Sequence, residues 1–425
     1  MKNNNLAILG GRRTIEHKFQ PYITIGDEEK KAAMEVLNSG VLSGFSASYK
    51  KDFYGGKYVR EFENFCKIKF DSKYAVSVNS WTSGLIAAVG AAGISPGDEV
   101  ITTPWSMCAT ATAILHWNAI PVFADIDRDT FNINPIQIEK KINKHTKAII
   151  AVDIFGQPCD MEEIIKIAEK YNLIVIGDSA QASGTYNNNK CTPSQAHIGG
   201  ISLNRHKHIQ TGEGGVCLTN SKEYYERMCL IRNHAEAIVG DMGIDNISNM
   251  IGYNFRLGEI EAAIGIEQLK KLDSFVESRR NCAEILNEEL KDIKEIQIPN
   301  ARQNTTHSYY IYPIVLNLNL IPVNRARIKQ ALEEEGVQGL SEGYVNIHRY
   351  PIFQKKIAYG KNGFPWNSSL NSNAIDYSVG ICPVAEELHD KSFLAFNNCH
   401  YDLKESEVRL IGKAFRKVFS SLNEL

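Results

Sequence analysis

A lysine in a glycine-flanked turn is the residue of this chain best suited to covalent chemistry. Lys207 lies in the run from Ser202 to Gly215, which ends in Gly-Glu-Gly-Gly. An amine in such a turn could anchor an aldehyde cofactor covalently, and it would then decide both the cofactor and the reaction. An ordinary surface turn with a solvated lysine explains the glycines equally well. The partners of Lys207 elsewhere in the chain therefore decide between the two interpretations.

Asp178 is a candidate partner because it follows the apolar run 173–177, so we expect it at the carboxyl end of a strand. A buried carboxylate at that position needs a cation. The protonated nitrogen of a pyridoxal phosphate ring is one such cation. Capping of a following helix is the alternative, and both remain open. Gln181 could reach the hydroxyl oxygen of the same ring.

A hydroxyl-rich turn over residues 79–85 separates an expected strand from an expected helix. Free backbone amides at a helix N-terminus, together with Ser and Thr hydroxyls, are suited to holding a phosphate dianion. Simple N-capping by Ser80 or Thr82 is the alternative. Ser202, five residues before Lys207, could donate to the same phosphate.

Together these motifs resemble the DegT/StrS-type sugar aminotransferases, which are pyridoxal phosphate enzymes of fold type I, the aspartate aminotransferase-like group. The resemblance extends through most of the chain, and its motifs occur in the correct order. The matching stretches are residues 79–85, 96–101, 121–127, 155–158, 177–182, 202–215, 252–256 and 267–273.

The resemblance implies a Schiff base between Lys207 and pyridoxal 5′-phosphate, with Asp178 on the pyridinium nitrogen and Gln181 beside the ring. It also implies phosphate contacts from three hydroxyl side chains, those of Thr82, Ser83 and Ser202. Asn254 would reach the phosphate bound by the neighbouring subunit. The active unit would therefore be a homodimer with shared active sites.

Two positions depart from the family pattern. Where the family usually places an aromatic residue against the ring, this chain has Met107, with Trp105 two residues earlier, and either could pack there. Asn204 stands where the family has a histidine. A related branch replaces the lysine itself with histidine and dehydrates deoxysugars. This chain keeps the amine at Lys207, which favours transamination.

The resemblance implies an amino donor, L-glutamate or L-glutamine, and a keto-sugar acceptor, most commonly nucleotide-linked, in amino-sugar biosynthesis for a surface polysaccharide or a secondary metabolite. The released Lys207 would act as general base and acid. A dehydratase of the same fold and a non-catalytic sensor are the alternatives. Specificity loops are expected around residues 43–57, 340–350 and 361–373. His206 and His208 lack a third ligand nearby, so we expect no metal.

The expected elements place these residues on one edge of a sheet. Strands are predicted at 73–78, 100–103, 121–126, 147–154 and 173–177, and helices at 82–93, 109–115 and 161–171. Apolar strands that alternate with helices predict an α/β fold whose mostly parallel sheet is covered on both faces. Ligands of such sheets bind at the carboxyl ends of the strands.

A second, smaller α+β domain is expected towards the C-terminus. Residues 259–290 predict one long helix or a helix pair that leads out of the sheet domain. Strands are expected at 309–318 and near Gly339, and helices at 323–335 and 405–422. We therefore expect a large cofactor-binding domain with the N-terminal segment over 1–275 and a small domain over 276–425. A polar loop is expected at 366–373.

Size and composition agree with this interpretation. A chain of 425 residues exceeds the usual size of one core. The net charge of −2 and the lack of a basic stripe argue against nucleic-acid binding. Nine cysteines without a CxxC pair predict free thiols in a reducing compartment. The N-terminal apolar patch, Leu6 to Leu9, is too short for a signal peptide, and no run of about 18 apolar residues exists, so we expect a cytoplasmic protein without a membrane partner.

Overall fold

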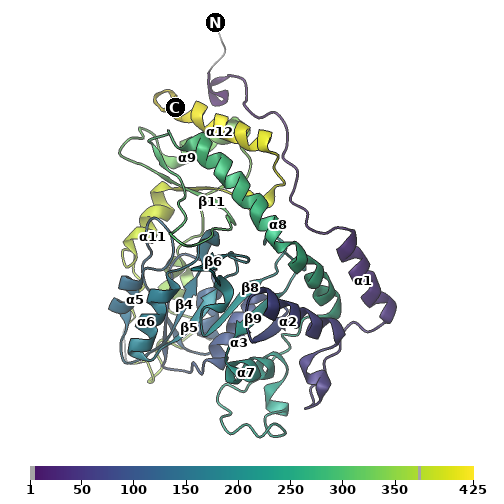
Figure 1. Ribbon diagram of the computed structural model, residues 1–425. Coiled ribbons are helices and arrows are strands. Elements are labelled where there is room, and N and C mark those ends of the chain that lie inside the picture. The colour runs from purple at the N-terminus through teal and green to yellow at the C-terminus, as the bar shows by residue number, and fades with distance from the viewer. Residues whose placement is uncertain (1–4, 372–374) are drawn as a thin grey trace.

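Seven strands form the central sheet of this protein (Figure 1). The computed structural model describes residues 5–371 and 375–425. Neighbouring strands run parallel from β8 to β3, whereas β9 is antiparallel to both of its neighbours. Across the sheet the strands are β1 (Tyr74–Val78), β9 (Gly215–Thr219), β8 (Ile198–Ser202), β5 (Ile174–Asp178), β4 (Thr146–Val152), β2 (Glu99–Thr102) and β3 (Ile120–Phe123). The predicted α/β fold with a mostly parallel sheet is confirmed.

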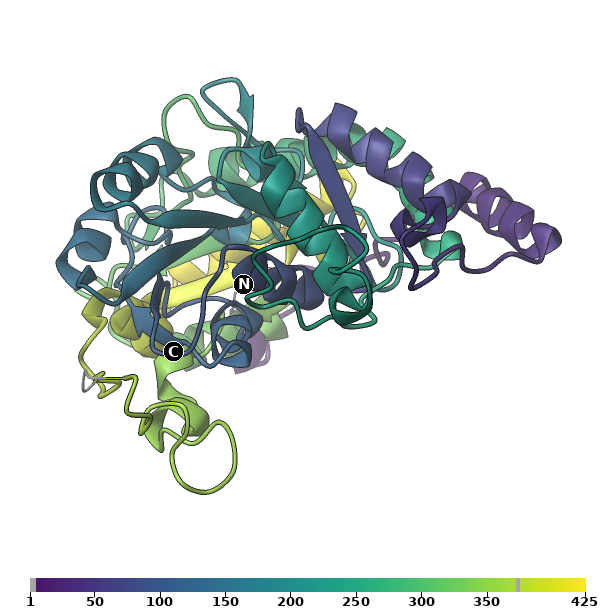
Figure 2. The same ribbon diagram turned by 90° about the horizontal axis from the view of Figure 1, so that it is seen from below.

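Both faces of this sheet are buried under helices, because successive side chains of a strand point to opposite faces. In β5, Ile176 packs under α3, whereas Val175 packs under α6. Figure 2 shows helices on both sides of the strands. One face carries α3 (Trp81–Ala91), α4 (Ala109–His116) and α7 (Lys222–Arg232). The other face carries α2 (Lys57–Lys69), α5 (Pro135–Lys141), α6 (Met161–Tyr171) and the first half of α8 (Glu259–Leu290).

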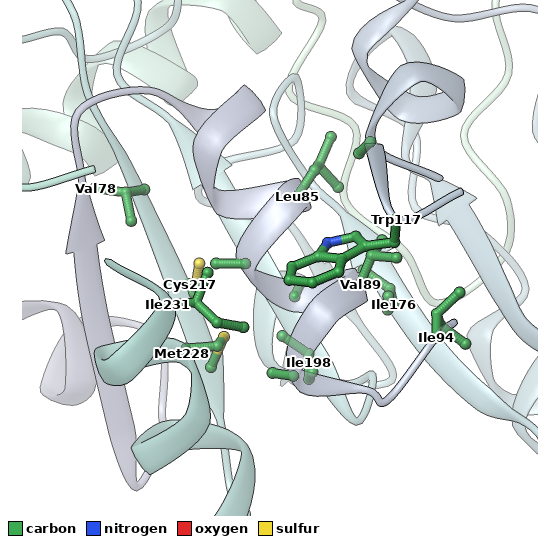
Figure 3. Close-up of a cluster of buried hydrophobic side chains, with 14 of the residues drawn as sticks. Val78, Leu85, Val89, Ile94, Trp117, Ile176, Ile198, Cys217, Met228 and Ile231 are labelled. Carbon is green, nitrogen blue, oxygen red and sulfur yellow. The ribbon is translucent and has the colours of Figure 1, made fainter. Parts of the chain in front are cut away.

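The helix α3 is fixed against the sheet by a dense apolar cluster (Figure 3). Leu85 and Val89 of α3 meet Ile176 of β5 and the ring of Trp117. Gly90 permits this approach, because a Cβ at that position would overlap the Trp117 ring. The packing holds the N-terminus of α3 at the edge of the sheet where β5 ends.

The single helix α8 connects the large sheet to a second, smaller unit. Its first half, from Ala262 to Val276, packs on the large sheet, and its second half, from Cys282 to Leu290, packs in a separate core. The expected domain boundary after residue 275 falls inside this helix. N-terminal residues that the expected division grouped with the large domain, Leu6, Ile15 and Phe19, lie in the second core.

The smaller unit is built on an antiparallel sheet of four strands. In spatial order these are β10 (Ile296–Gln297), β11 (Tyr312–Leu316), β13 (Phe393–Phe396) and β12 (Leu340–Ser341). The strand expected at 309–318 is shorter, because Tyr309 has a positive φ of 48°, which a strand does not allow.

The remaining elements of the whole protein are α1 (Asp27–Ser39), α9 (Arg325–Glu334), α10 (Pro351–Gln354), α11 (Pro383–Glu387), α12 (Glu405–Phe419) and the hairpin β6 (Tyr186–Asn187) and β7 (Lys190–Cys191).

Further predictions concern membrane spans, the N-terminal segment and loops, and the cysteines. Within the described residues, no helix is both long and apolar enough to cross a membrane. Residues 1–4 of the expected N-terminal segment, and residues 372 and 373 of the expected polar and specificity loops, lie outside the described part of the chain. All nine cysteines are free thiols, and Cys108 is the one that is half-buried rather than buried.

Candidate active site

Lys207 is buried in the loop that joins the antiparallel strands β8 and β9. Only 8% of its surface is exposed. The loop closes on itself through hydrogen bonds from the Leu203 N–H to the Gly214 carbonyl (3.0 Å) and from the Thr211 N–H to the Leu203 carbonyl (2.9 Å). Gly214 has a φ of +156°, a backbone conformation that residues with a side chain rarely adopt. The loop thus presents a buried amine rather than a solvated one.

Asp178, the last residue of β5, is held by three donors. Its Oδ1 accepts hydrogen bonds from the indole Nε1 of Trp81 (2.7 Å) and the backbone N–H of Ala180 (3.1 Å). Its Oδ2 accepts one from the hydroxyl of Thr110 (3.2 Å). Burial nevertheless raises the pKa of this carboxyl, and these donors together with the charge of Lys207 oppose the rise. The carboxylate is therefore poised to pair with a cation in the cavity.

Lys207 faces this carboxylate from a largely apolar environment. Burial lowers the pKa of its amine from 10.5 to about 8, and the charge of Asp178 opposes this shift. The Nζ atom lies 4.4 Å from the ring centroid of Tyr310. An amine with a pKa near 8 is neutral in roughly a tenth of molecules at pH 7, far more than an ordinary lysine, and the neutral form is the one that acts as a nucleophile or general base.

Gln181 is positioned by a backbone group of the neighbouring strand connection. Its side-chain oxygen accepts a hydrogen bond from the N–H of Phe155 (2.8 Å), so its NH₂ group must point the other way, where it donates to the hydroxyl of Tyr344 (3.0 Å). Phe155 adopts a left-handed conformation (φ +60°), which is uncommon for a non-glycine residue. Tyr344 in turn is hydrogen-bonded to Tyr310. Hydrogen bonds thus connect Gln181 through Tyr344 to Tyr310, whose ring contacts the Lys207 amine.

The turn before α3 combines capping with an open hydroxyl. The hydroxyl of Ser80 accepts the backbone N–H of Ser83 (3.1 Å), so Ser80 caps the helix. The Ser83 hydroxyl donates to the side-chain oxygen of Asn79 (2.7 Å) within the same turn. Thr82 and Ser202 line the cavity that contains Lys207. The two interpretations of this turn are therefore compatible, because the cap uses the Ser80 hydroxyl and not that of Thr82. The Ser202 hydroxyl, at the end of β8, accepts the N–H of Asn204 (3.3 Å) and can still donate to a ligand.

Met107 and Trp105 occupy different environments. Met107 is half-exposed and lines the cavity with Lys207. Trp105 is fully buried in an aromatic cluster, with its ring against Phe155 and Phe393, and its Nε1 donates to the carbonyl of Tyr344. The structure thus brings Met107 to the cavity and leaves Trp105 behind it.

The remaining predicted residues lie around the cavity or outside it. Asn254 is exposed, its side-chain oxygen accepts from Arg256 (2.8 Å), and its backbone carbonyl accepts from Asn79 (3.4 Å) of the turn before α3. His206 lines the cavity mouth, and burial lowers its pKa to about 4. His208 is buried and contacts the carbonyl of Ser308 (3.0 Å). No group of three potential metal ligands occurs within the described residues.

Several residues of the site escaped the sequence reasoning. Trp81 and Thr110 both hold Asp178, and Tyr310 and Tyr344 lie over Lys207 and Gln181. Trp81 lies within the recognised turn, so its position was a usable signal. Tyr344 lies in the loop at 340–350 that was expected to set specificity, whereas no local pattern points to Tyr310, which comes more than a hundred residues after Lys207.

The chemistry of this cavity fits pyridoxal 5′-phosphate. The cavity brings together one amine for the aldehyde, one buried carboxylate for the ring nitrogen, and hydroxyls beside a helix N-terminus for the phosphate. Within the described part of the chain, Lys207 is the cation that acts on this carboxylate, and a protonated ring nitrogen would add the further positive charge that burial favours. These residues therefore fit the cofactor that the resemblance implied.

Comparison with known proteins gives an independent result. The DegT/DnrJ/EryC1/StrS aminotransferase family matches residues 24–390. A GDP-perosamine synthase of Escherichia coli O157:H7 is 32% identical over 80% of this chain and 87% of its own. The spore coat polysaccharide biosynthesis protein SpsC of Bacillus subtilis (strain 168) is 31% identical over 84% of this chain and 90% of its own.

A solved structure agrees with these sequence matches. PseC of Helicobacter pylori, an aminotransferase involved in the biosynthesis of pseudoaminic acid, has a TM-score of 0.77 and 28% identity, over 95% of this chain and 100% of that one. The family match spans the whole cavity, from Ser80 to Gly214. The protein is thus a pyridoxal phosphate-dependent aminotransferase that belongs to the DegT/DnrJ/EryC1/StrS aminotransferase family.

Proposed function

We propose that this enzyme transfers an amino group from L-glutamate or L-glutamine to a keto sugar in amino-sugar biosynthesis, and that this sugar is linked to a nucleotide. The observation that carries the proposal is the buried Lys207 amine opposite Asp178 in a cavity with open hydroxyls. The names of the perosamine synthase and the polysaccharide biosynthesis protein support a sugar as the acceptor. The free thiols support a reducing compartment, the cytoplasm, as the place of the reaction.

The residues of the site divide the work between them. Pyridoxal phosphate, when bound, supplies the electron sink that makes the donor's α-proton removable. Lys207 would hold the cofactor through its amine and, when that amine is free, would move the donor's proton as base and then as acid. Asp178, Gln181 and Met107 all line the cavity. There Asp178 would keep the ring nitrogen protonated, Gln181 would lie beside the ring, and Met107 would pack against it. Thr82 and Ser202 donate to the phosphate, with Ser83 fixing the turn.

We further propose that Asn254 completes the phosphate site of a second subunit, so that the enzyme works as a homodimer. Its side chain is exposed and lies next to the turn that holds the phosphate in its own subunit. Mixing inactive Lys207→Ala and Asn254→Ala proteins tests this arrangement. If the residues act across the interface, mixed dimers contain one intact site and recover about a quarter of the activity. No recovery would place both residues in the same site.

The half-reaction with the donor tests the transaminase chemistry. The imine on Lys207 gives a visible absorption band, which should bleach on addition of L-glutamate or L-glutamine and return with a keto-sugar acceptor. Lys207→Ala serves as the control and should show neither the band nor turnover. A band that persists with every amino donor would refute the proposed function, and loss of water from the sugar without amination would indicate a dehydratase.

A screen of acceptors against the aminated enzyme identifies the substrate class. Recovery of the band would be measured with nucleotide-linked 3-keto and 4-keto hexoses, free keto sugars and keto-cyclitols. We expect recovery with the nucleotide-linked compounds at the lowest concentration. Recovery with the free compounds alone would contradict the nucleotide requirement while leaving transamination intact.

A further inference from the structure

A second cavity lies away from the active site, at the edge of the large sheet formed by β1. It is enclosed by a short helical turn (Lys51–Tyr54), α2, the start of β1 and α7. Its volume is about 430 Å³, which is within the range of about 300–1,000 Å³ typical of small-molecule sites. We call it the basic pocket, because four of its lining residues are cations: Lys51, Arg60, Lys67 and Lys73.

These four cations have no ion-pair partner within residues 5–371 and 375–425. Glu63 is the acidic residue that lines the pocket, and its carboxylate already forms an ion pair with Arg232. Its Oε1 accepts hydrogen bonds from the buried Arg232 (2.6 Å) and from the N–H (2.8 Å) and hydroxyl (2.9 Å) of Ser77. Four uncompensated positive charges around one concavity repel one another and favour an anion in their midst.

The geometry indicates an elongated anion rather than a single small ion. Arg60 and Lys67 are seven residues apart on α2, which separates them by about 10 Å along one face of the helix. Lys51 and Lys73 approach from two other elements. A ligand that reaches several of these cations must carry more than one negative charge over some length.

A stack of tyrosines forms an apolar wall of the same pocket. The rings of Tyr74 and Tyr225 lie 4.8 Å apart at an interplanar angle of 22°, and those of Tyr54 and Tyr225 lie 6.3 Å apart at 7°. A planar ring attached to the anion would find an apolar surface here.

We propose that the basic pocket binds a diphosphate group, either free or as part of a nucleoside diphosphate. Arg60 supplies the planar fork that matches phosphate oxygens, and the lysines supply charge. The volume of the pocket, about 430 Å³, suits a small molecule of this kind. None of the residues placed in the catalytic cavity takes part, so the site is distinct from it.

Calorimetric titration of the holoenzyme with inorganic pyrophosphate and with uridine 5′-diphosphate tests this proposal. The bound cofactor keeps the phosphate site of the catalytic cavity filled. In Lys67→Glu and Lys73→Glu we expect the Kd for both ligands to rise at least about tenfold, because a charge-assisted contact is replaced by repulsion. Transaminase activity should not change in these variants, since neither lysine lines the active site.

Lys144→Glu is the matched control, because it makes the same charge change at an exposed lysine outside the pocket. Its Kd values should equal those of the unmodified enzyme. Tighter binding of uridine 5′-diphosphate than of pyrophosphate would identify a nucleotide as the source of the diphosphate, and equal binding would identify the free ion. Absence of binding, or an equal loss in Lys67→Glu and Lys144→Glu, would overturn the proposal.

Discussion

The indole Nε1 of Trp81 donates a 2.7 Å hydrogen bond to Oδ1 of Asp178, and this bond joins the start of α3 to the end of β5. Gly200 of β8 makes room for it, because a Cβ there would overlap the Trp81 ring. The bond fixes one oxygen of the carboxylate, while Thr110 holds the other. The helix whose N-terminus borders the cavity thus also orients the carboxylate that we propose pairs with the ring nitrogen.

Trp81→Phe keeps the ring and removes this hydrogen bond. Asp178 would lose a donor to a charged acceptor, and we expect the Kd for pyridoxal phosphate to rise by about tenfold. Absorbance titration of the cofactor-free enzyme measures it. Trp117→Phe is the control, because the Trp117 indole donates to the carbonyl of Ile86 (2.7 Å) outside the cavity. An equal effect of the two substitutions would show that only packing was lost.

The residues that could be predicted from the sequence are those whose position follows from a local pattern. Asp178 comes directly after an apolar run, and it does end a strand. The turn before α3 could be recognised by its hydroxyls, and Lys207 by the glycines that follow it. Because the carboxyl ends of neighbouring parallel strands meet at one edge, these three parts could be expected to converge.

The residues that could not be predicted depend on contacts between distant segments. Tyr310 and Tyr344 contact Lys207 and Gln181 from the smaller unit, and no local pattern specifies how that unit packs against the sheet. Trp105 and Met107 both follow the end of β2, and the sequence alone does not show which of the two side chains points into the cavity. The aromatic cluster around Phe155 and Phe393 takes the tryptophan, and this leaves the methionine at the cavity.

Substitutions at Tyr310 separate the function of its ring from that of its hydroxyl. The ring lies against the Lys207 amine, and such contacts contribute about 0.5–2 kcal/mol. Tyr310→Leu should therefore slow the bleaching of the absorption band by saturating L-glutamate by about tenfold. Tyr310→Phe should slow it much less. Stopped-flow absorbance measures both rates, and equal rates in the two variants would exclude an effect of the ring.

The loading of cofactor should depend on pH through Lys207. Only the neutral amine attacks an aldehyde, and burial lowers the pKa of this amine to about 8. The rate at which the band appears in cofactor-free enzyme should rise with pH and level off above about pH 8.

Asp178→Asn removes a charge that raises this pKa, so the midpoint of the loading profile should move to lower pH in that variant. Free Nα-acetyl-lysine, whose ε-amine is unmodified, is the reference, with a midpoint near its ordinary pKa of about 10.4. A midpoint in the enzyme equal to that of the reference would contradict the burial of the amine.

Asp153 should make the protein less stable as the pH rises. It is fully buried, accepts from the Ser179 hydroxyl (2.6 Å) and the Cys159 N–H (2.8 Å), and burial raises its pKa from 3.8 to about 6. The folded state therefore binds the proton more tightly than the unfolded state. The stabilisation is complete below pH 3.8 and is lost as the pH rises through about 6.

Asp153→Asn removes this titration. Between pH 4 and pH 7 its unfolding free energy should rise relative to the unmodified protein by up to about 3 kcal/mol. Chemical denaturation at several pH values measures the difference, and Asp245→Asn serves as an exposed control. A difference that stays constant with pH would show that Asp153 does not titrate in this range.

Reduction of the holoenzyme with sodium borohydride tests the central claim most directly. The reduction turns an imine into a stable amine, so the cofactor remains attached to the lysine that carried it. Peptide mapping by mass spectrometry should find the added mass on Lys207 alone, and its amount should fall when L-glutamate is added before the reductant. Attachment to another lysine, or none at all, would contradict the assignment of Lys207 as the cofactor anchor.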